Sequence, residues 1–447
     1  MERARVIPLR SPAPAVIVRI GHGERSAPLV YDRQRGTVAL PPGLIRELGL
    51  VPGQEVHVVA RDGGHRFVIG PLVGLWVSPA AIRDWSTSVR VLVEETRAAG
   101  AIPLVFDLDG AERREGRIAG WVERDGEPGR AILPLPDVIY NRATYPSLQR
   151  RARARRLRER MMELDRIPFV NTASGFPKWE TYETLRFFAE TRDLVPDAIR
   201  FGSQESLARF LRRHRLVFLK ENTGSGGRHV LRIAAASGGW RVAGRSGRYR
   251  TRQRFSRLGE LHAFLARITR RGDWVLQEGV PLPRLRGRPW DVRLEAKKDE
   301  NGEWQVPFIF IRWGHPEAVV TNEAQGGDTF LLSDFLARFG RTGELANLED
   351  TATRVGRLVA LALEARFGMQ GEIGVDFGLD PQGRPRVFEA NAKSSHAPVP
   401  GQAEPQARWP LRYAVRLAGR AWMGQESGLP LPVPAGGTVT TGAGDKP

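Results

Sequence analysis

Alternating hydrophobic and polar positions predict a pair of strands near the C-terminal end of the 447-residue chain. The segment GEIGVDFGLDPQGRPRVFEANAK alternates over Ile373–Leu379 and again over Pro385–Ala390, with a turn rich in Pro and Gly between them. Asp376 and Glu389 therefore lie on adjacent strands, and Glu389 and Asn391 share a face because side chains alternate along a strand. The pattern places three oxygen donors on one side of a hairpin.

These oxygen donors favour a magnesium site. Mg²⁺ is a hard cation that binds a few carboxylates together with substrate phosphates. The alternative is a hairpin with ordinary surface acids. Glu389 argues against that alternative, because it follows two apolar residues and precedes an alanine, a setting in which an unpaired carboxylate is costly. The candidate metal ligands are Asp376, Glu389 and Asn391.

The first 70 residues alternate in short runs and predict a small β-rich module. Thr37–Leu40 reads as a strand, the following two prolines open a helix that runs to Leu48, and Glu55–Ala60 reads as another strand. The stretch 30–60 resembles one half of an AbrB-type DNA-binding barrel, a module that usually needs a second copy. DNA binding through this module is therefore one function to test.

Residues 71–165 predict a small α/β unit. An apolar run is followed by the amphipathic stretch Ala80–Ala99, which predicts a helix, and then by the strands Ile102–Phe106 and Val138–Tyr140. Strand–helix–strand spacing of this kind indicates parallel pairing. The remaining chain divides into a mixed α+β region over 166–418 and a Gly-, Pro- and Thr-rich tail over 419–447, which we expect to be flexible.

A glycine-rich turn in LVFLKENTGSGGRHVLRI offers a second chemical signal. Lys220 ends the apolar strand Leu216–Leu219, where an ammonium is rarely placed without an anionic partner. The small residues that follow have backbone N–H groups that can fold over phosphates. The spacing excludes a Walker A loop, because no Lys-Ser/Thr pair follows the glycines. A simple turn and a phosphate-binding loop both remain open interpretations.

An arginine on a buried strand is the third signal. In the segment Asp291–Glu295, Asp291 and Arg293 share one strand face and apolar residues occupy the other. The planar guanidinium of Arg293 suits a phosphate or carboxylate, which it can bind bidentately. An internal ion pair of Arg293 with Asp291 or Glu295 explains the pattern equally well.

Composition excludes several classes of function. The chain has no cysteine, so disulfides, Cys-ligated zinc and thiol catalysis are excluded. No run approaches eighteen apolar residues and the N-terminal segment lacks a signal-peptide core, so we expect a cytoplasmic protein without a membrane partner. Only six of the 68 basic residues are lysines, and the net charge of +18 comes from arginines spread along the chain. We interpret the densest stretch, Arg150–Arg160, as a solvated helix face or a surface for acidic ligands rather than a nucleic-acid site.

The order and spacing of these motifs resemble the ATP-grasp superfamily: a lysine, a second lysine with a glycine loop, a hinge strand, D-x-R and D-x12-E-x-N. Within it, the chain is similar to the YheC/YheD endospore coat-associated family of spore-forming bacteria over roughly residues 10–415. The segments that carry the finer similarity are Gly70–Gly74, Leu135–Arg142, Phe176–Trp179 and Gly371–Asp376.

The resemblance implies an α/β (α+β) fold in which a two-lobed ATP-grasp domain over 166–418, with its lid at roughly 185–276, follows an α/β pre-ATP-grasp domain and the β-rich module. It also implies an ATP- and Mg²⁺-dependent ligase that joins a small-molecule or peptide carboxylate to an amine through an acyl phosphate. Arg293 and Lys220 would be catalytic, and the metal would bind the three ligands named above. The residues implied in ATP binding are Lys178 and Lys220, the loop Thr223, Gly224, Ser225, Gly226 and Gly227, and the hinge Gln277, Glu278, Gly279 and Val280.

One departure and two alternatives accompany this resemblance. Such enzymes usually carry an acid a few residues after the hinge that binds the ribose, and none occurs over 281–290. A structural, spore-associated protein that binds ATP without ligation is the first alternative, and the DNA-binding module is the second. We expect small-molecule or peptide substrates rather than a nucleic acid, and the family implies spore association.

Overall fold

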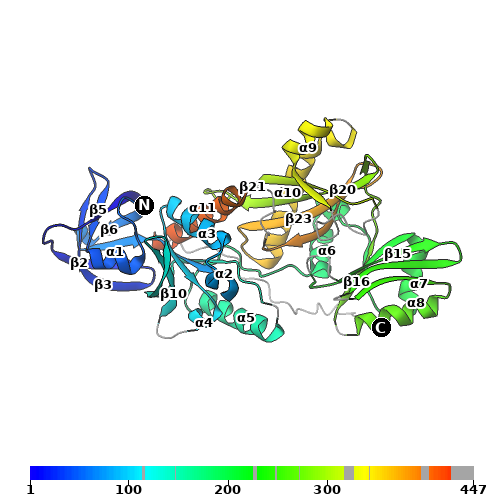
Figure 1. Ribbon diagram of the computed structural model, residues 1–447, viewed down its shortest axis with the longest axis horizontal. Coiled ribbons are helices and arrows are strands. Elements are labelled where there is room, and N and C mark those ends of the chain that lie inside the picture. The colour runs from blue at the N-terminus through cyan, green and yellow to red at the C-terminus, as the bar shows by residue number, and fades with distance from the viewer. Residues whose placement is uncertain are drawn as a thin grey trace, which may run out of the picture.

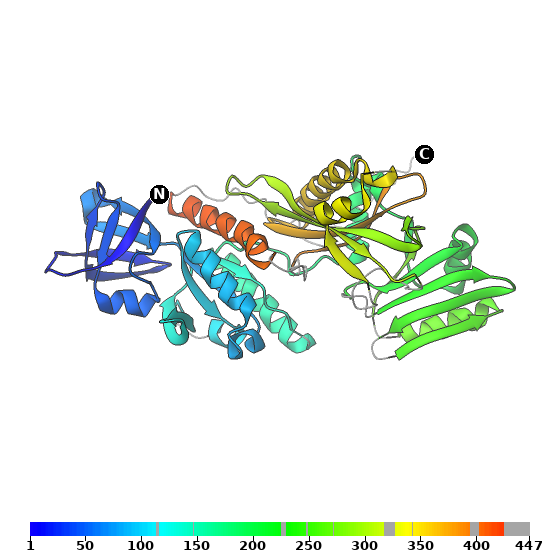
Figure 2. The same cartoon turned by 45° about the horizontal axis from the view of Figure 1, so that its top comes forward.

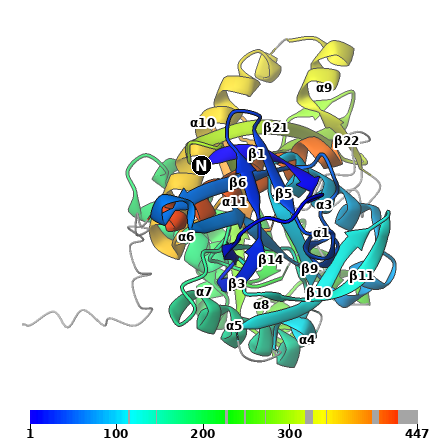
Figure 3. The ribbon, with the colours of Figure 1, turned by 90° about the vertical axis from the view of Figure 1, so that its left-hand side faces the viewer.

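The computed structural model describes most of the chain as four β-sheets with helices packed against them (Figure 1). The mixed α/β architecture predicted from the sequence is confirmed. The sheets follow one another along an elongated molecule, and the N-terminal sheet lies in front when the molecule is viewed from that end (Figure 3). No described helix has both the length and the apolar character needed to cross a bilayer. The described residues are 1–112, 116–145, 147–224, 229–246, 249–270, 272–316, 327–341, 343–393 and 402–423.

The N-terminal sheet has seven strands, all from this one chain. Its order is β3-β2-β7-β6-β1-β5-β4, with parallel pairs β1–β5 and β2–β7 among antiparallel ones. The predicted strand–helix–strand stretch is present as β5, α1 and β6, and five further strands from the same chain complete its sheet. The elements are β1 (Glu2–Pro8), β2 (Ala15–Ile20), β3 (Gly23–Pro28), β4 (Val30–Asp32), β5 (Thr37–Leu40), α1 (Pro42–Leu48), β6 (Glu55–Arg61) and β7 (Arg66–Gly70).

The second sheet, in the order β11-β10-β9-β8-β12, contains the predicted parallel pairs β8–β9 and β8–β12. The expected single helix over 80–99 is two helices instead. Buried Trp85 has a φ of 37° and Ser86 is extended, so the chain turns before the longer helix begins. The elements are β8 (Leu72–Trp76), α2 (Pro79–Arg83), α3 (Thr87–Ala98), β9 (Ile102–Phe106), α4 (Leu108–Ala111), β10 (Arg117–Arg124), β11 (Glu127–Pro134), β12 (Val138–Asn141) and α5 (Leu148–Glu163).

The third sheet, in the order β13-β18-β14-β15-β16-β17, lies at the far end of the molecule from the N-terminal sheet, and helices α7 and α8 cover one of its faces (Figure 2). Buried positions alternate with partly exposed ones along β14 and in the middle of β15, as expected for a sheet with one buried face. The elements from α6 onward are α6 (Lys178–Phe187), β13 (Ala198–Arg200), α7 (Gln204–Arg213), β14 (Leu216–Glu221), β15 (His229–Ala236), β16 (Gly239–Ser246), β17 (Tyr249–Phe255), α8 (Leu258–Thr269) and β18 (Trp274–Glu278).

The central sheet has the order β22-β21-β20-β23-β24, with β19 paired to β20. Helix α10 covers it with Val355, Val359 and Leu363, which recur every four residues and are fully buried. Every residue of β23 is buried. The elements are β19 (Arg284–Leu285), β20 (Arg288–Lys298), β21 (Trp304–Trp313), β22 (Asp328–Leu331), α9 (Leu332–Phe339), α10 (Leu348–Phe367), β23 (Glu372–Leu379) and β24 (Pro385–Asn391).

Helix α11 (Ala403–Trp422) follows the central sheet in sequence but packs against the second sheet. Its residues Leu411, Ala414 and Ala418 belong to the same buried cluster as side chains of α3 and β12. Trp422 Nε1 donates a hydrogen bond to Asp137 Oδ1 at 2.8 Å, just before β12. Figure 2 shows this helix beside α3, so segments from opposite ends of the chain share one core.

A buried charge cluster joins the central sheet to the second one. Lys297 is fully buried between Glu295 and Glu372, each 3.1 Å from its ammonium. Arg142, which follows β12, pairs with Glu372 at 2.5 Å. The cluster therefore fixes the end of β20 and the start of β23 against the neighbouring sheet.

We expect Lys297→Met to lower the free energy of unfolding by about 3–5 kcal/mol, because it leaves two buried carboxylates with one fewer cation between them. Urea unfolding of the parent and the variant measures the loss. Lys298→Met is the matched control, since Lys298 pairs with the partly exposed Glu364 and its loss should cost less. Equal stability of parent and Lys297→Met would contradict the prediction.

Candidate active site

The pairing of β23 with β24 brings the three candidate metal ligands together. Asp376 lies opposite Glu389, and Gly374 lies opposite Asn391. A register shift follows directly, because Phe377 pairs with Val387 and leaves the residue between Val387 and Glu389 unpaired. Such a bulge re-aims side chains locally, and here it sets the Glu389 carboxylate across from Asp376.

Arg293 lies among these ligands. Strand β20 runs beside β23 so that Arg293 faces Asp376, and its Nη1 donates to Asp376 Oδ1 at 2.8 Å. With the amide of Asn391 oriented so that both its polar atoms have partners, Oδ1 accepts from Arg293 Nη1 at 3.2 Å and Nδ2 donates to Glu389 Oε1 at 3.1 Å. The D-x-R strand and the D-x12-E-x-N hairpin thus form one polar cluster.

Arg312 on β21 belongs to the same cluster, although the sequence analysis did not select it. Its Nε and Nη2 bind Asp291 at 2.7 and 2.8 Å, and its Nη1 binds Asp376 Oδ2 at 3.1 Å. Its signal was available, since it is an arginine in the apolar strand FIFIRW, as Arg293 is in its own. Burial would raise the pKa of Asp376, but the guanidiniums of Arg293 and Arg312 outweigh burial and hold this pKa well below its usual range.

The donor set fits a magnesium ion. Two carboxylates and one amide oxygen are hard ligands of the kind that Mg²⁺ prefers. The low pKa of Asp376 keeps its carboxylate ionised, as metal coordination requires. The guanidinium of Arg293 contacts two of these oxygens, Asp376 Oδ1 and Asn391 Oδ1.

Lys178 connects this cluster to the glycine-rich turn. It opens α6, is 5% exposed, and places its ammonium 3.7 Å from Glu389 Oε2. The same ammonium donates to the backbone oxygen of Gly224 at 2.5 Å. Thr223 is exposed in the turn after β14, whereas Ser225, Gly226 and Gly227 lie outside the described residues.

Asn222, which the sequence analysis did not select, holds the start of α6 to the glycine-rich turn. It is 4% exposed, its backbone oxygen accepts from Lys178 N at 3.0 Å, and its Oδ1 accepts from Trp179 N at 2.8 Å. Asn222 opens the glycine-rich segment in the sequence, but nothing in that pattern indicates its contacts with α6.

Lys220 extends from β14 toward the same region. Its ammonium donates to Gln277 Oε1 and lies 5.6 and 5.8 Å from the ring centres of Phe218 and Phe388. Burial lowers the pKa of Lys220 to about 8, against the opposing influence of the nearby Glu389 carboxylate. Within the described residues its partners are an amide and two rings, with no carboxylate at ion-pair distance. A half-buried ammonium with neutral hydrogen-bond partners is suited to an anionic ligand.

The hinge residues use most of their polar groups within the protein. The backbone N–H groups of Glu278 and Gly279 donate to Asp197 O and Leu216 O, both at 2.8 Å. Gln277 is 1% exposed; its Oε1 accepts from Lys220, while its buried Nε2 has no hydrogen-bond partner among the described residues. Val280, the fourth hinge residue, is buried directly after them.

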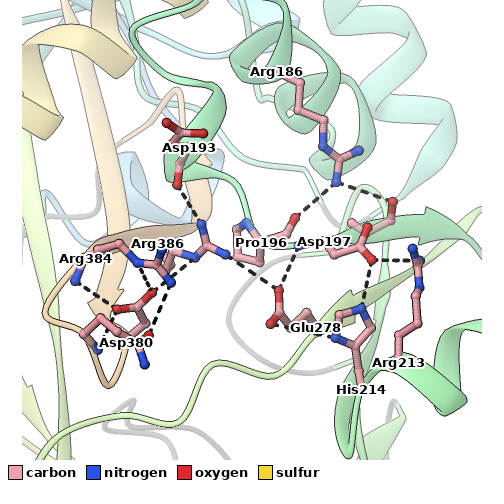
Figure 4. Close-up of polar contacts among 12 residues, drawn as sticks. Arg186, Asp193, Pro196, Asp197, Arg213, His214, Glu278, Asp380, Arg384 and Arg386 are labelled. Atoms are coloured by element: carbon pink, nitrogen blue, oxygen red, sulfur yellow. Dashed lines mark hydrogen bonds and ion pairs between the residues drawn. The ribbon is translucent and has the colours of Figure 1, made fainter.

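The Glu278 carboxylate belongs to a polar network that joins the third sheet to the central hairpin (Figure 4). It accepts from Asp197 N at 3.1 Å and lies 3.8 Å from His214 Nδ1 and 3.9 Å from Arg386 Nη2. His214 Nε2 lies 2.8 Å from Asp197 Oδ2, and Arg386 on β24 donates to Asp193 O at 2.7 Å. Through these contacts, the Glu278 side chain anchors the hinge.

Comparison with known proteins gives three kinds of match. A family model described as YheC/D like ATP-grasp matches residues 166–417. Endospore coat-associated protein YheD of Bacillus subtilis (strain 168) is 26% identical over 378 residues, covering 80% of this chain and 79% of that protein. Endospore coat-associated protein YheC of the same strain is 22% identical over 285 residues, covering 63% and 77%. Among solved structures, D-alanyl-alanine synthetase A from Vibrio cholerae O1 biovar eltor str. N16961 aligns with a TM-score of 0.47 and 11% identity, covering 79% of this chain and 99% of that one.

Proposed function

This chain belongs to the YheC/D-like ATP-grasp family, and from that premise we propose that it is an ATP- and Mg²⁺-dependent ligase that joins a carboxylate to an amine through an acyl phosphate. The observation that carries the proposal is the convergence of Arg293, Asp376, Glu389 and Asn391, with Lys178 and Lys220 facing the same place. Cations and oxygen ligands gathered in this way suit a nucleotide's phosphates and their metal.

The proposed reaction has two displacements. A carboxylate oxygen of the donor attacks the γ-phosphorus of ATP, an oxygen–phosphorus bond forms, and the bond from that phosphorus to ADP breaks. The amine nitrogen then attacks the acyl carbon, the carbon–nitrogen bond forms, phosphate leaves with the carbon–oxygen electron pair, and the nitrogen loses a proton. No protein nucleophile takes part, which agrees with a chain that lacks cysteine.

Each cation of the site has a proposed role in this reaction. Lys178 and Lys220 bind phosphate oxygens, and Arg293 neutralises the phosphoryl group as it moves. Asp376, Glu389 and Asn391 hold Mg²⁺, which draws electron density from the phosphate oxygens when bound.

The hinge would hold the adenine. Because the N–H groups of Glu278 and Gly279 already donate within the protein, we assign the adenine-facing backbone donor to Val280. Glu278 itself would position the hinge through its contacts with Asp197 and Arg386 rather than touch the base. Spore association is proposed as well, since the names of YheD and YheC place those proteins with the endospore coat.

The test is a search for the activated carboxylate. Purified protein is incubated with ATP, Mg²⁺, pools of amino acids, peptides and other carboxylates, and hydroxylamine, which converts an acyl phosphate to a hydroxamate. We expect phosphate release and hydroxamate formation that require both ATP and Mg²⁺ and one carboxylate pool. Binding of the ATP analogue AMPPNP without hydroxamate from any pool would favour the non-catalytic, ATP-binding alternative.

A further inference from the structure

Helices α7 and α8 cover one face of the third sheet (Figure 2). Val217, Ile233 and Val242 lie side by side on β14, β15 and β16 and are buried against these helices. Because side chains alternate along a strand, the residues next to them in sequence lie on the opposite face. No described residue at these opposite positions of β14 to β17 is buried. We call this the open face of the third sheet.

Arginines of β15, β16 and β17 lie on the open face. The register places Arg241 of β16 directly opposite Arg254 of β17. Arg232 of β15 and Arg252 of β17 lie opposite the same residue of β16, one from each side. Arg250 shares the face of Arg252, because the two are two residues apart on one strand. We call Arg232, Arg241, Arg250, Arg252 and Arg254 the arginine surface.

The arginine surface carries charge of one sign. Among the described residues of β14 to β17, the open-face positions hold arginines, one lysine and apolar residues, with no Asp or Glu. The loops that join these strands, 222–228, 237–238 and 247–248, contain no acid in the sequence either. Arg254 donates to the backbone oxygen of Ser237 at 2.5 Å. In the described part of the chain, no guanidinium of this surface lies at ion-pair distance from a carboxylate.

This arrangement is costly in the absence of a ligand. Like charges directly opposite each other in a sheet are destabilising, as Arg241 and Arg254 are here. Arg241 also lies diagonally across from Arg232, and burial together with this neighbour lowers the pKa of Arg232. Charged residues on an edge strand can protect a sheet from aggregation. That role fits β17 but not Arg232 and Arg241, because β15 and β16 are interior strands.

The spacing of the arginines fits an extended peptide. Arg250, Arg252 and Arg254 recur at about 7 Å along β17, and every second side chain of an extended peptide recurs at the same distance. Alternate acidic side chains can therefore meet successive arginines. A single-stranded nucleic acid would call for aromatic rings on which its bases stack, and among the described open-face residues of β14 to β17 Phe218 is the one aromatic. A lipid surface would call for exposed large apolar side chains, and no described one lies on the third sheet.

We propose that the arginine surface binds an acidic stretch of a polypeptide in extended conformation. The proposal goes beyond the ligase activity, because this binding requires neither ATP nor Mg²⁺. The surface begins beside the proposed nucleotide site. Arg232 lies directly opposite Phe218, whose ring centre is 5.6 Å from the Lys220 ammonium. A polypeptide bound here lies next to the cleft in which the phosphates are proposed to bind.

The test measures binding of a fluorescent peptide of alternating Glu and Ser residues to the full chain by anisotropy. We expect binding that weakens as ionic strength rises, because charges on an exposed face are screened. The counterpart peptide with Gln in place of Glu should not bind. The double variant Arg241→Gln/Arg254→Gln should weaken binding of the Glu peptide by about three- to thirtyfold, the combined effect of losing two exposed charge pairs.

Two controls separate this surface from net charge and from a structural role. Arg209→Gln/Arg212→Gln removes the same charge from exposed positions of α7, on the other side of the sheet, and should leave peptide binding unchanged. Arg241→Gln alone should leave the melting temperature unchanged or higher, because it removes one of two opposed like charges. A marked fall in melting temperature would show that Arg241 has a structural role instead.

The outcomes that would overturn the proposal are specific. They are equal binding of the Glu and Gln peptides, no binding of the Glu peptide at low ionic strength, and an equal loss of affinity in the double variant and its α7 control. Tighter binding of a single-stranded oligonucleotide or of phosphatidylserine vesicles through the same arginines would also overturn it, because the occupant would then be of another class. Failure of the ligase is seen separately, as the absence of hydroxamate, and leaves peptide binding to the arginine surface intact.

Discussion

Glu389→Gln should reduce Mg²⁺-dependent ATP turnover by about 10²- to 10³-fold while the melting temperature stays near that of the parent. The carboxylate is one of three proposed protein ligands, and a bound metal contributes several kcal/mol to charge stabilisation in phosphoryl transfer. The side chain of Glu389 is 23% exposed and its ion-pair partner Lys178 is 3.7 Å away, so its amide isostere leaves little uncompensated charge. Phosphate release at several Mg²⁺ concentrations and a thermal melt measure the two effects.

Asp376→Asn should lose activity to a similar degree but should also destabilise the protein. Asp376 accepts from both Arg293 and Arg312 in a buried setting, and removing its charge leaves two guanidiniums without full compensation, at a cost of about 3–5 kcal/mol. The two variants together separate metal binding from structure. If both turn over ATP like the parent, the hairpin acids serve only to hold the arginines in place.

Lys220→Met should weaken AMPPNP binding by about ten- to a hundredfold, the worth of one charge-assisted phosphate contact. The same change should leave the melting temperature unchanged or raise it, because the free protein buries this ammonium against an amide and aromatic rings rather than a carboxylate. Weaker AMPPNP binding together with an unchanged or higher melting temperature would indicate that Lys220 serves ligand binding and not stability. A marked drop in melting temperature with unchanged binding would show that Lys220 pairs with an internal acid.

The pH dependence of the free energy of unfolding gives a second test of the burial of the Lys220 ammonium. Its pKa in the folded protein is about 8, below that of an unfolded lysine at about 10.4. Between these values the folded state has released the proton and the unfolded state still holds it, so stability rises with pH across this window and is flat outside it. Urea unfolding at several pH values from 7 to above 10 should show this rise in the parent and its loss in Lys220→Met.

The family and the mixed α/β fold could be predicted from the sequence because their signals are local. Strand alternation and turn residues fix the hairpin that carries Asp376 and Glu389, and its strands match the predicted ones within a residue. Pairings between strands that are far apart in the sequence could not be predicted from it. By sequence, Arg293 had two possible acid partners, Asp291 and Glu295, and only the register of β20 against β23 shows that it faces Asp376.

The N-terminal module was harder to interpret for a related reason. The stretch 30–60 carries the pattern of half a barrel, and the pattern gives no sign of where the other half originates. In the structure β1 and β2 pair in parallel with β5 and β7, so one chain supplies the whole sheet. A second copy is not needed to complete it.

The return of α11 to the second sheet has a consequence for synthesis on the ribosome. Translation delivers the chain from its N-terminus, so α3 and β12 emerge long before the helix that covers them. While the third and central sheets are being synthesised, part of the apolar face of the second sheet stays uncovered. A nascent chain that stops before residue 403 would lack this cover and would present that face to chaperones and proteases.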